Sequence, residues 1–299
     1  MEHVLTVIAP PASGLLDRAS LDAARAAIRQ LGGLAGSPRW LKQGEAADIP
    51  FAELAPEAAE AAARAALGEA PFDLVAQPAE GRRKRLLVAD MDSTIVVGET
   101  LDELAAVAGL KERIAAITAR AMNGELDFKE ALRQRVAMLA GLPGATLAEV
   151  EARITPMPGA ATLVATMRAH GAFAALVSGG FRYFTRRVAA RLGFDLDQGN
   201  ELEIEGAALT GRVVEPILDK DAKLATLRRL AAALGLPLSA TLAVGDGAND
   251  LPMLQAAGLG VAFRAKPAVA AASRVRIDHA GLTALLWAQG YTEAELVQP

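Results

Sequence analysis

The stretch Leu86-Leu87-Val88-Ala89-Asp90-Met91-Asp92-Ser93-Thr94 decides how the largest part of this chain folds. Its apolar first half is typical of a buried parallel strand, whose end delivers the next side chains to the carboxyl edge of a sheet. Two carboxylates that meet there repel each other unless a divalent cation or a shared proton relieves the repulsion. The pattern therefore predicts a metal-assisted site in which Asp90 attacks a substrate and Asp92 transfers protons. A solvated acidic turn after the strand is the alternative.

Two further apolar runs, at residues 173–177 and 241–244, also end in polar and glycine-rich sequence. The first continues into Ser178-Gly179-Gly180, which offers a hydroxyl and flexible backbone N–H groups to phosphate oxygens, although an ordinary turn is the alternative. The second continues into Gly245-Asp246-Gly247-Ala248-Asn249-Asp250, where glycines let the backbone approach an ion bound by Asp246. Each run is followed by a helical pattern, which favours an α/β fold with a doubly wound parallel sheet.

Lys223 lies near the start of a helix that we predict from about residue 221 to 234. A lysine is disfavoured there because the N-terminal end of a helix carries positive partial charge. Its position suggests a specific role, although a surface lysine is the simpler alternative. Carboxylates, a hydroxyl, an amide and a lysine at one sheet edge are the groups that phosphoryl transfer requires.

Residues 98–158, between the first two apolar runs, are too many for one crossover helix and are rich in helix formers. We predict that they form a helical cap inserted after the first strand, and that residues 194–215 form a β-hairpin. One face of a helix in the cap carries apolar residues at helical spacing around Arg135, namely Phe128, Leu132, Val136 and Leu139. Arg135 either faces a carboxylate ligand or reaches past the apolar stripe to solvent.

Residues 1–78 alternate between strand-like and helix-like patterns in the order β-α-β-β-α-β, which predicts a small ferredoxin-like α+β domain. The predicted elements lie at residues 4–9, 20–31, 38–51, 55–67 and 72–76. The charged segment 79–85 marks a domain boundary, and we interpret its basic run Arg82-Arg83-Lys84-Arg85 as a solvated linker.

The composition of the 299-residue chain excludes several classes of function. The chain has no cysteine, which rules out thiolate metal sites, and its three histidines are not at metal-ligand spacing. A net charge of -4 argues against a nucleic-acid partner. Although 52% of the residues are hydrophobic, no apolar run reaches the ~18 residues of a membrane span, and the first residues lack a signal-peptide pattern. We therefore expect a cytoplasmic protein without membrane contact.

In this order, D-x-D-S-T, S-G-G, a lysine and G-D-G-x-N-D resemble the motifs of the haloacid dehalogenase (HAD) superfamily, whose phosphatases use an aspartate nucleophile. The resemblance covers residues 84–299 and extends to the members that hydrolyse O-phospho-L-serine in the last step of serine biosynthesis. It implies a Mg²⁺-dependent phosphomonoester hydrolase with a Rossmann-like core and the helical cap. Residues 1–80 resemble, by element order alone, the ACT-like regulatory domains of some relatives. For them we expect amino-acid sensing, with L-serine as effector, or dimerisation into a homodimer.

The resemblance also implies the catalytic and metal-binding roles of individual residues. Asp90 would be the nucleophile that forms an aspartyl-phosphate, and Asp92 would be the general acid and base. Mg²⁺ would be held by the Asp90 side chain, the Asp92 backbone carbonyl and the Asp246 side chain. Asp250 would support the water ligands of the metal.

The remaining implied contacts bind the substrate. Phosphoryl oxygens would be held by Ser178, Gly179, Lys223 and Asn249. The rest of the substrate would be held in the cap by Glu99, Met122, Phe128 and Arg135. Glu99 would meet the ammonium group and Arg135 the carboxylate, an arrangement that suits a zwitterionic amino acid.

Other functions stay open on the sequence alone. The aspartate could pass the phosphoryl group to another alcohol, as in homoserine phosphotransferase-like relatives, or the substrate could be another small phosphomonoester. A different class is a non-catalytic amino-acid-binding regulator that uses the N-terminal domain. The presence of every nucleophile, acid and metal position argues against that regulator.

Overall fold

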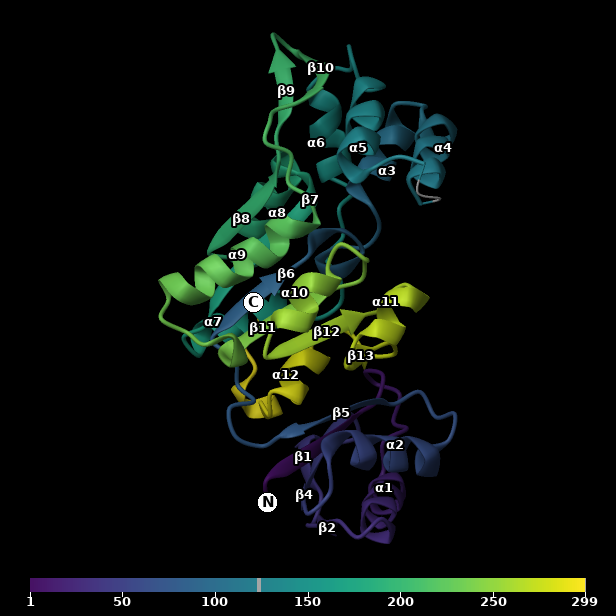
Figure 1. Cartoon of the computed structure of the whole chain (residues 1–299), viewed down its shortest axis with the longest axis vertical. Coiled ribbons are helices and arrows are strands. Elements are labelled where there is room, and N and C mark those ends of the chain that lie inside the picture. Colours follow the sequence, from purple (N-terminus) through teal and green to yellow (C-terminus); the bar gives the residue numbers. More distant parts are fainter. Residues whose placement is uncertain (123–124, 299) are drawn as a thin grey trace.

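The computed structural model describes residues 1–122 and 125–298. Figure 1 shows an N-terminal unit at one end, a parallel sheet with its helices in the middle, and a group of helices at the other end. None of the helices formed by the described residues is both long enough and apolar enough to cross a membrane.

The N-terminal unit is an antiparallel sheet with helices against one of its faces. Its elements in chain order are β1 (His3–Ile8), α1 (Arg18–Gln30), β2 (Leu34–Ala35), β3 (Arg39–Lys42), β4 (Ala46–Ala52), α2 (Pro56–Leu67) and β5 (Asp73–Pro78). Strand β1 lies between β4 and β5 and is antiparallel to both. The predicted order of elements is present, with the short strand β2 added before β3.

The second unit is built on a parallel sheet with the strand order β13-β12-β11-β6-β7-β8. Its strands are β6 (Leu86–Ala89), β7 (Phe173–Phe181), β8 (Leu196–Asn200), β11 (Thr241–Gly245), β12 (Leu259–Phe263) and β13 (Val275–Ile277). The chain adds β7 and β8 on one side of β6 and then returns to add β11, β12 and β13 on the other. The order therefore reverses at β6, and such a switch point opens a crevice beyond the carboxyl ends of the strands. The predicted parallel α/β sheet is confirmed.

Alternate residues along these strands face two layers of helices. Leu87 and Leu176 share a buried cluster with α7 (Ala160–Ala169), α8 (Arg182–Leu192) and α12 (Ala284–Ala288). Leu86 and Val177 share another with α9 (Lys220–Ala233), α10 (Leu251–Ala256) and α11 (Pro267–Ala272). Because both faces are covered, the strands are apolar almost throughout, which made them recognisable in the sequence.

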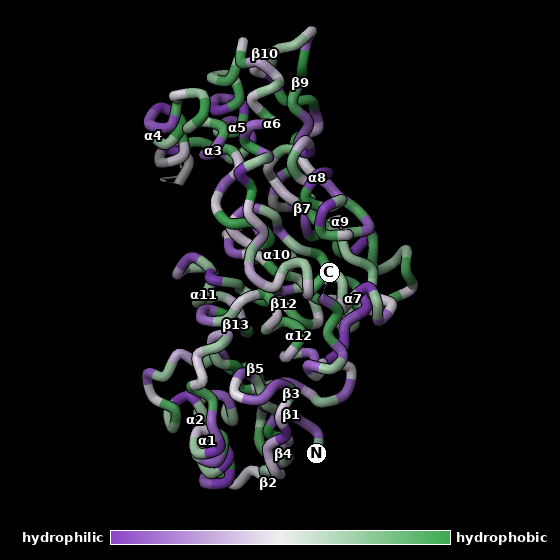
Figure 2. The backbone as a smooth tube through the Cα atoms, turned by 180° about the vertical axis from the view of Figure 1, so that it is seen from behind, coloured by the Kyte–Doolittle hydropathy of each residue, from purple (hydrophilic) through white to green (hydrophobic). Residues whose placement is uncertain are grey.

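A helical insertion lies between β6 and β7. It follows the turn Met91–Ile95 and contains α3 (Thr100–Val107), α4 (Lys111–Met122), α5 (Phe128–Ala137) and α6 (Ala145–Glu151). The insertion leaves and rejoins the core through adjacent antiparallel segments, in which the Val97 N–H donates to the Thr155 carbonyl at 2.9 Å. Figure 2 shows hydrophilic stretches in α4 of the insertion and in α1, at opposite ends of the molecule.

The predicted hairpin is formed by β9 (Leu202–Glu205) and β10 (Ala208–Val213), which pair antiparallel. It extends the helical insertion, because the Gly141 N–H at the end of α5 donates to the Leu209 carbonyl of β10 at 2.8 Å. Figure 1 accordingly shows β10 beside α5 and α6 and away from the parallel sheet.

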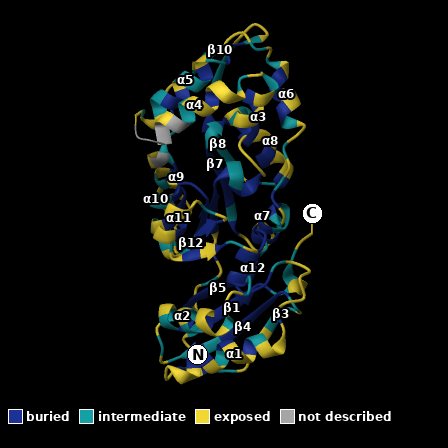
Figure 3. Ribbon diagram, turned by 90° about the vertical axis from the view of Figure 1, so that its right-hand side faces the viewer, coloured by how far each residue is buried: buried dark blue, intermediate teal, exposed yellow. Residues whose placement is uncertain are grey.

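The open face of the N-terminal sheet is covered by the C-terminal part of the second unit. Ile8 and Val75 belong to the same buried cluster as Trp287 of α12, and Figure 3 shows α12 and the facing strands as buried. The carboxylate of Asp73 is 2% exposed and accepts three backbone N–H groups at 2.8–3.3 Å, from Asp278, His279 and Ala280. The two units therefore share a core.

The basic run at residues 82–85 is only partly solvated. Arg83 and Arg85 are exposed, but the interpretation as a solvated linker was wrong for Arg82 and Lys84. Lys84 is buried, and its ammonium group donates to the Gly81 and Ser239 carbonyls at 2.8 Å each. Arg82 pairs with the buried Asp48 at 2.6 Å. The partners that bury these charges come from both units and lie far away in the sequence, where local composition does not reveal them.

We expect Asp73→Asn to lower the free energy of unfolding by about 1–3 kcal/mol, because an amide cannot accept all of the N–H groups that the carboxylate accepts. Urea unfolding measures this loss. Asp22→Asn is the matched control, since Asp22 forms an exposed pair with Arg18 whose loss should cost less than about 1 kcal/mol. Equal effects of the two substitutions would contradict a role for Asp73 in joining the units.

Candidate active site

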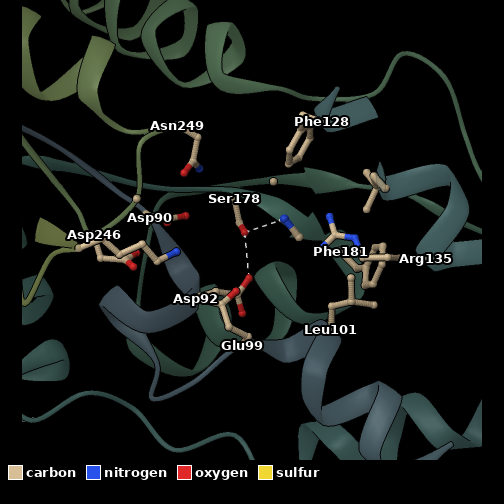
Figure 4. A pocket seen from close by; sticks show the side chains of 15 residues that line it. Asp90, Asp92, Glu99, Leu101, Phe128, Arg135, Ser178, Phe181, Asp246 and Asn249 are labelled. Atoms are coloured by element: carbon tan, nitrogen blue, oxygen red, sulfur yellow. Dashed lines mark hydrogen bonds between the residues drawn. The ribbon is translucent and has the colours of Figure 1, made fainter. Parts of the chain in front are cut away.

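The apolar strands recognised in the sequence end side by side and bring their polar neighbours to one edge of the sheet. Ala89 of β6 is in register with Val244 of β11, and the Asp90 N–H donates to the Val244 carbonyl at 3.0 Å. Strand β7 flanks β6 on the other side. Asp90, Ser178 and Asp246 consequently line one pocket (Figure 4).

The turn Met91–Ile95 after β6 directs Asp90 and Asp92 to the same pocket. Ser93 has a φ of +55°, a left-handed conformation that is uncommon outside glycine and requires support from its surroundings. Its N–H donates to the Gly98 carbonyl at 2.9 Å, and the Met91 N–H donates to the Asp90 carboxylate at 2.8 Å. The turn is therefore held by its own hydrogen bonds in the shape that the two acids need.

Lys223 is the cation that allows carboxylates to be buried together. Its side chain extends from the first turn of α9 and is 2% exposed, with Nζ 2.7 Å from Asp90 Oδ1 and 2.6 Å from Asp250 Oδ1. Asp250 Oδ2 in turn accepts the Gly247 N–H at 2.9 Å. Burial opposes a charge on Lys223, but Asp90 and Asp250 raise its pKa above the usual value, so it stays protonated. The alternative of a surface lysine is excluded.

The acidic groups of the pocket carry more charge than Lys223 can balance. Carboxylate oxygens of Asp90, Asp246 and Asp250 lie within 4.8 Å of one another. Burial, followed by the nearby Asp250, raises the pKa of Asp246 to about 6. Burial also holds the pKa of Asp90 well above its usual range, despite the opposing effect of Lys223.

This donor set fits Mg²⁺, because Mg²⁺ prefers carboxylate oxygens and its charge would relieve the repulsion. Lys223 and the Gly247 N–H already engage both oxygens of Asp250. Asp90 and Asp246 are therefore the more available ligands, with Asp250 behind them.

Asp92 lies on the insertion side of the pocket. The Thr100 N–H donates to its Oδ1 at 2.9 Å, and the Ser178 hydroxyl donates to its Oδ2 at 3.3 Å. Burial and the nearby charge of Glu99 raise the pKa of Asp92 to about 6. A carboxyl group with such a pKa can both give and accept a proton near neutral pH.

The residues predicted to hold phosphoryl oxygens surround the same pocket. Ser178 is buried, and its hydroxyl accepts the Gly180 N–H at 2.8 Å. A Cβ atom on Gly179 would lie 3.1 Å from the ring of Phe128, so the missing side chain makes room for that ring. Asn249 lines the pocket as well (Figure 4), while Lys223 lies beneath it against Asp90.

The helical insertion contributes opposite charges to the pocket. Glu99 accepts the Ser93 hydroxyl at 2.8 Å, and Arg135 of α5 donates from Nε to the Ala131 carbonyl at 3.2 Å. Burial lowers the pKa of Arg135 from its usual value, an effect that Asp102 and Glu99 oppose. Figure 4 shows the guanidinium group directed into the cavity.

Two further residues of the insertion were predicted to bind the substrate. Phe128 lines the pocket and is 38% exposed, which places it at the mouth. Met122 ends α4, but its side chain lies outside the described residues.

Several lining residues were not among the predicted site residues, namely Leu101, Leu132, Gly180, Phe181, Gly247 and Lys266. Lys266 follows β12, and residues that follow parallel strands meet at one edge of the sheet. Its position after a fourth apolar strand could therefore have identified it from the sequence. Leu132 lies on the apolar stripe around Arg135. Thr94 belongs to the opening stretch, and its hydroxyl donates to Asp246 at 3.3 Å.

Known proteins are similar to this chain in sequence and in fold. Residues 87–255 match the model of the haloacid dehalogenase-like hydrolase family. The chain is 48% identical over 215 residues to phosphoserine phosphatase SerB2 of Mycobacterium tuberculosis, a match that covers 72% of this chain and 53% of that protein. The chain thus spans about half the length of that relative.

Two solved structures match nearly the whole chain, the N-terminal unit included. A HAD family hydrolase from Salmonella enterica serovar Typhi has a TM-score of 0.83 and 32% identity, and the match covers 96% of this chain and 99% of that one. A probable phosphoserine phosphatase from Vibrio cholerae has a TM-score of 0.78 and 31% identity, and the match covers 98% and 88%.

We expect the affinity for Mg²⁺ to fall about tenfold per pH unit below pH 6, because a proton then competes with the metal for Asp246. Above pH 6 the contribution of Asp246 should level off, since that carboxylate is already ionised, and any further rise would come from Asp90, whose pKa is also raised. Isothermal titration calorimetry at pH 5, 6, 7 and 8 measures this dependence. An affinity that does not change between pH 5 and pH 7 would contradict the raised pKa.

Proposed function

The chain belongs to the haloacid dehalogenase-like hydrolase family, and we propose that it is a Mg²⁺-dependent phosphoserine phosphatase. It would hydrolyse O-phospho-L-serine to L-serine and phosphate. The observation that carries the proposal is the pocket of about 190 Å³ that is lined both by Asp90 and Asp92 and by the opposite charges of Glu99 and Arg135. The SerB2 relative and the solved Vibrio cholerae structure, both named as phosphoserine phosphatases, support it.

The pocket favours a small zwitterionic substrate. Its volume is well below the several hundred Å³ of sites for larger ligands. Arg135 presents a planar fork that suits a carboxylate, and Glu99 supplies the negative charge that an ammonium group needs. A phosphomonoester of an amino acid satisfies both charges while its phosphoryl group reaches Asp90.

In the proposed reaction, the Asp90 carboxylate attacks phosphorus. The bond from phosphorus to the serine oxygen breaks, and Asp92 gives its proton to that oxygen. Water then attacks the aspartyl-phosphate and gives a proton to Asp92, which releases phosphate and restores Asp90. Ser178, the Gly179 backbone, Asn249 and Lys223 hold the transferred oxygens.

Positive charge is needed to bring a phosphoryl dianion beside these acids. Mg²⁺, when bound, supplies that charge and stabilises the charge that develops on the phosphoryl oxygens. Its proposed protein ligands are Asp90, Asp246 and the Asp92 backbone carbonyl, with Asp250 supporting its water ligands.

For the N-terminal unit, amino-acid sensing and dimerisation stay predictions, with L-serine and a homodimer as the candidate effector and assembly. The open face of its sheet packs on the second unit. A second copy would therefore meet this unit at α1, α2 or a sheet edge.

Phosphate release from O-phospho-L-serine with and without Mg²⁺, beside phosphoethanolamine, phosphothreonine and p-nitrophenyl phosphate, tests the proposal. We expect Mg²⁺-dependent turnover with a preference for phosphoserine, and no turnover by Asp90→Asn, which lacks the nucleophile. Added homoserine that yields phosphohomoserine would instead indicate a phosphotransferase. A preference for the other phosphate esters would contradict the assigned substrate.

Arg135→Ala should lower kcat/KM for phosphoserine about 10- to 100-fold, the loss expected for a hydrogen bond to a charged group. Phosphoethanolamine lacks the carboxylate, so its kcat/KM should change little. Arg133→Ala is the matched control on the same helix, because Arg133 is exposed and pairs with Glu215 at 2.7 Å. Equal losses for both substrates would mean that Arg135 supports the fold or the chemistry and does not read the carboxylate.

A further inference from the structure

Thr100, the first residue of α3, has a buried hydroxyl that the proposed mechanism does not use. Thr100 is 3% exposed, and its Oγ1 has no hydrogen-bond partner among the described residues. Buried hydroxyl groups without a partner are rare because they carry a free-energy cost. Such a group beside a reaction centre therefore calls for an explanation.

The Thr100 hydroxyl and the Asp92 carboxylate lie on the same side of Gly180. A Cβ atom placed on Gly180 would lie 2.7 Å from Asp92 Oδ2, 3.1 Å from Ser178 Oγ and 3.6 Å from Thr100 Oγ1. These oxygens thus surround one face of Gly180, where any larger residue would push them apart.

The backbone of Thr100 already holds the other oxygen of the same carboxylate. Its N–H donates to Asp92 Oδ1 at 2.9 Å, while Asp92 Oδ2 receives only a longer contact of 3.3 Å from Ser178. Glu99 directly precedes Thr100 and is fixed by the Ser93 hydroxyl. The two adjacent residues therefore have linked roles. Glu99 faces the ammonium group of the substrate in our proposal, and Thr100 holds Asp92.

We infer that Thr100 is a positioning residue that orients the Asp92 carboxyl group toward the leaving oxygen. This inference rests on the proposed function, in which Asp92 gives its proton to the oxygen whose bond to phosphorus breaks. The Thr100 N–H holds Oδ1, and in this role the hydroxyl becomes a second donor to the carboxyl group when substrate fills the pocket. Because Thr100 is the first residue of α3, the position of the helical insertion then affects the orientation of the Asp92 carboxyl group.

The dependence of kcat/KM on the leaving group tests this role. Departure of an alkyl alcohol requires the proton from Asp92, whereas p-nitrophenolate leaves without it. Since a general acid contributes about 10²- to 10⁴-fold, its misorientation in Thr100→Val should lower kcat/KM at least about tenfold for phosphoserine and phosphoethanolamine. The value for p-nitrophenyl phosphate should change less than about threefold, on the same reasoning.

Two further variants separate positioning from packing. Thr100→Ser keeps the hydroxyl and should recover most of the lost activity. Thr146→Val makes the same change at another buried threonine of the insertion. It should leave kcat/KM unchanged for the alkyl phosphates and for p-nitrophenyl phosphate. Thr100→Ala replaces Thr100→Val if the latter does not fold, as judged by thermal unfolding.

Equal losses for alkyl and p-nitrophenyl esters, or no recovery in Thr100→Ser, would overturn the inference and make Thr100 a packing residue. The result does not depend on the substrate assignment. If the wild-type protein cleaves other alkyl phosphates and not phosphoserine, the proposed substrate fails, and the same comparison with glycerol phosphate still tests Thr100.

Discussion

Lys223 holds together two carboxylates that would otherwise repel each other inside the protein. A buried ion pair that loses one partner leaves an uncompensated charge, which strongly destabilises a fold. Asp90 follows β6 and Asp250 begins α10, so the lysine of α9 joins the central strand of the sheet to the helical layer beside it. The rest of the pocket depends on this contact, because Lys223 fixes the position of Asp90 at the point where the strand order reverses.

The same contact sets the electrostatic character of the pocket. Lys223, Lys266 and Arg135 are the cations near five acids, Asp90, Asp92, Asp246, Asp250 and Glu99, so carboxylates are in excess. Burial raises the pKa of Asp92 and of Asp246 to about 6. A phosphoryl dianion cannot approach such a surface without added positive charge. The cluster of Asp90, Asp246 and Asp250 therefore fits the divalent cation that the proposed function requires.

The fold and the core of the site could be predicted because their signals are local. Parallel strands buried on both faces read as apolar runs, and the residues after them must meet at one edge, which located Asp90, Ser178 and Asp246. The assignment of Arg82 and Lys84 to a linker failed because their partners, Asp48 and Ser239, lie far along the chain. Thr100 went unrecognised for a related reason: a threonine at a helix start is ordinary, and only the turn at Ser93 brings it against Asp92.

The helical insertion is held to the core both by buried apolar contacts and by exposed ion pairs. Lys129 of α5 pairs with Asp219 before α9 at 2.9 Å, and Arg133 pairs with Glu215, and all four side chains are at least a quarter exposed. Exposed pairs of this type stabilise a fold by about 1 kcal/mol or less, far below the cost of breaking the buried pairs of Lys223. These exposed pairs therefore add little to the seating of α5, whose buried Leu132 and Val136 belong to the same apolar cluster as Phe181 of β7. In the proposed function the substrate bridges Glu99 and Arg135 of the insertion and Asp90 of the core, so its binding would add to the contacts that join the two.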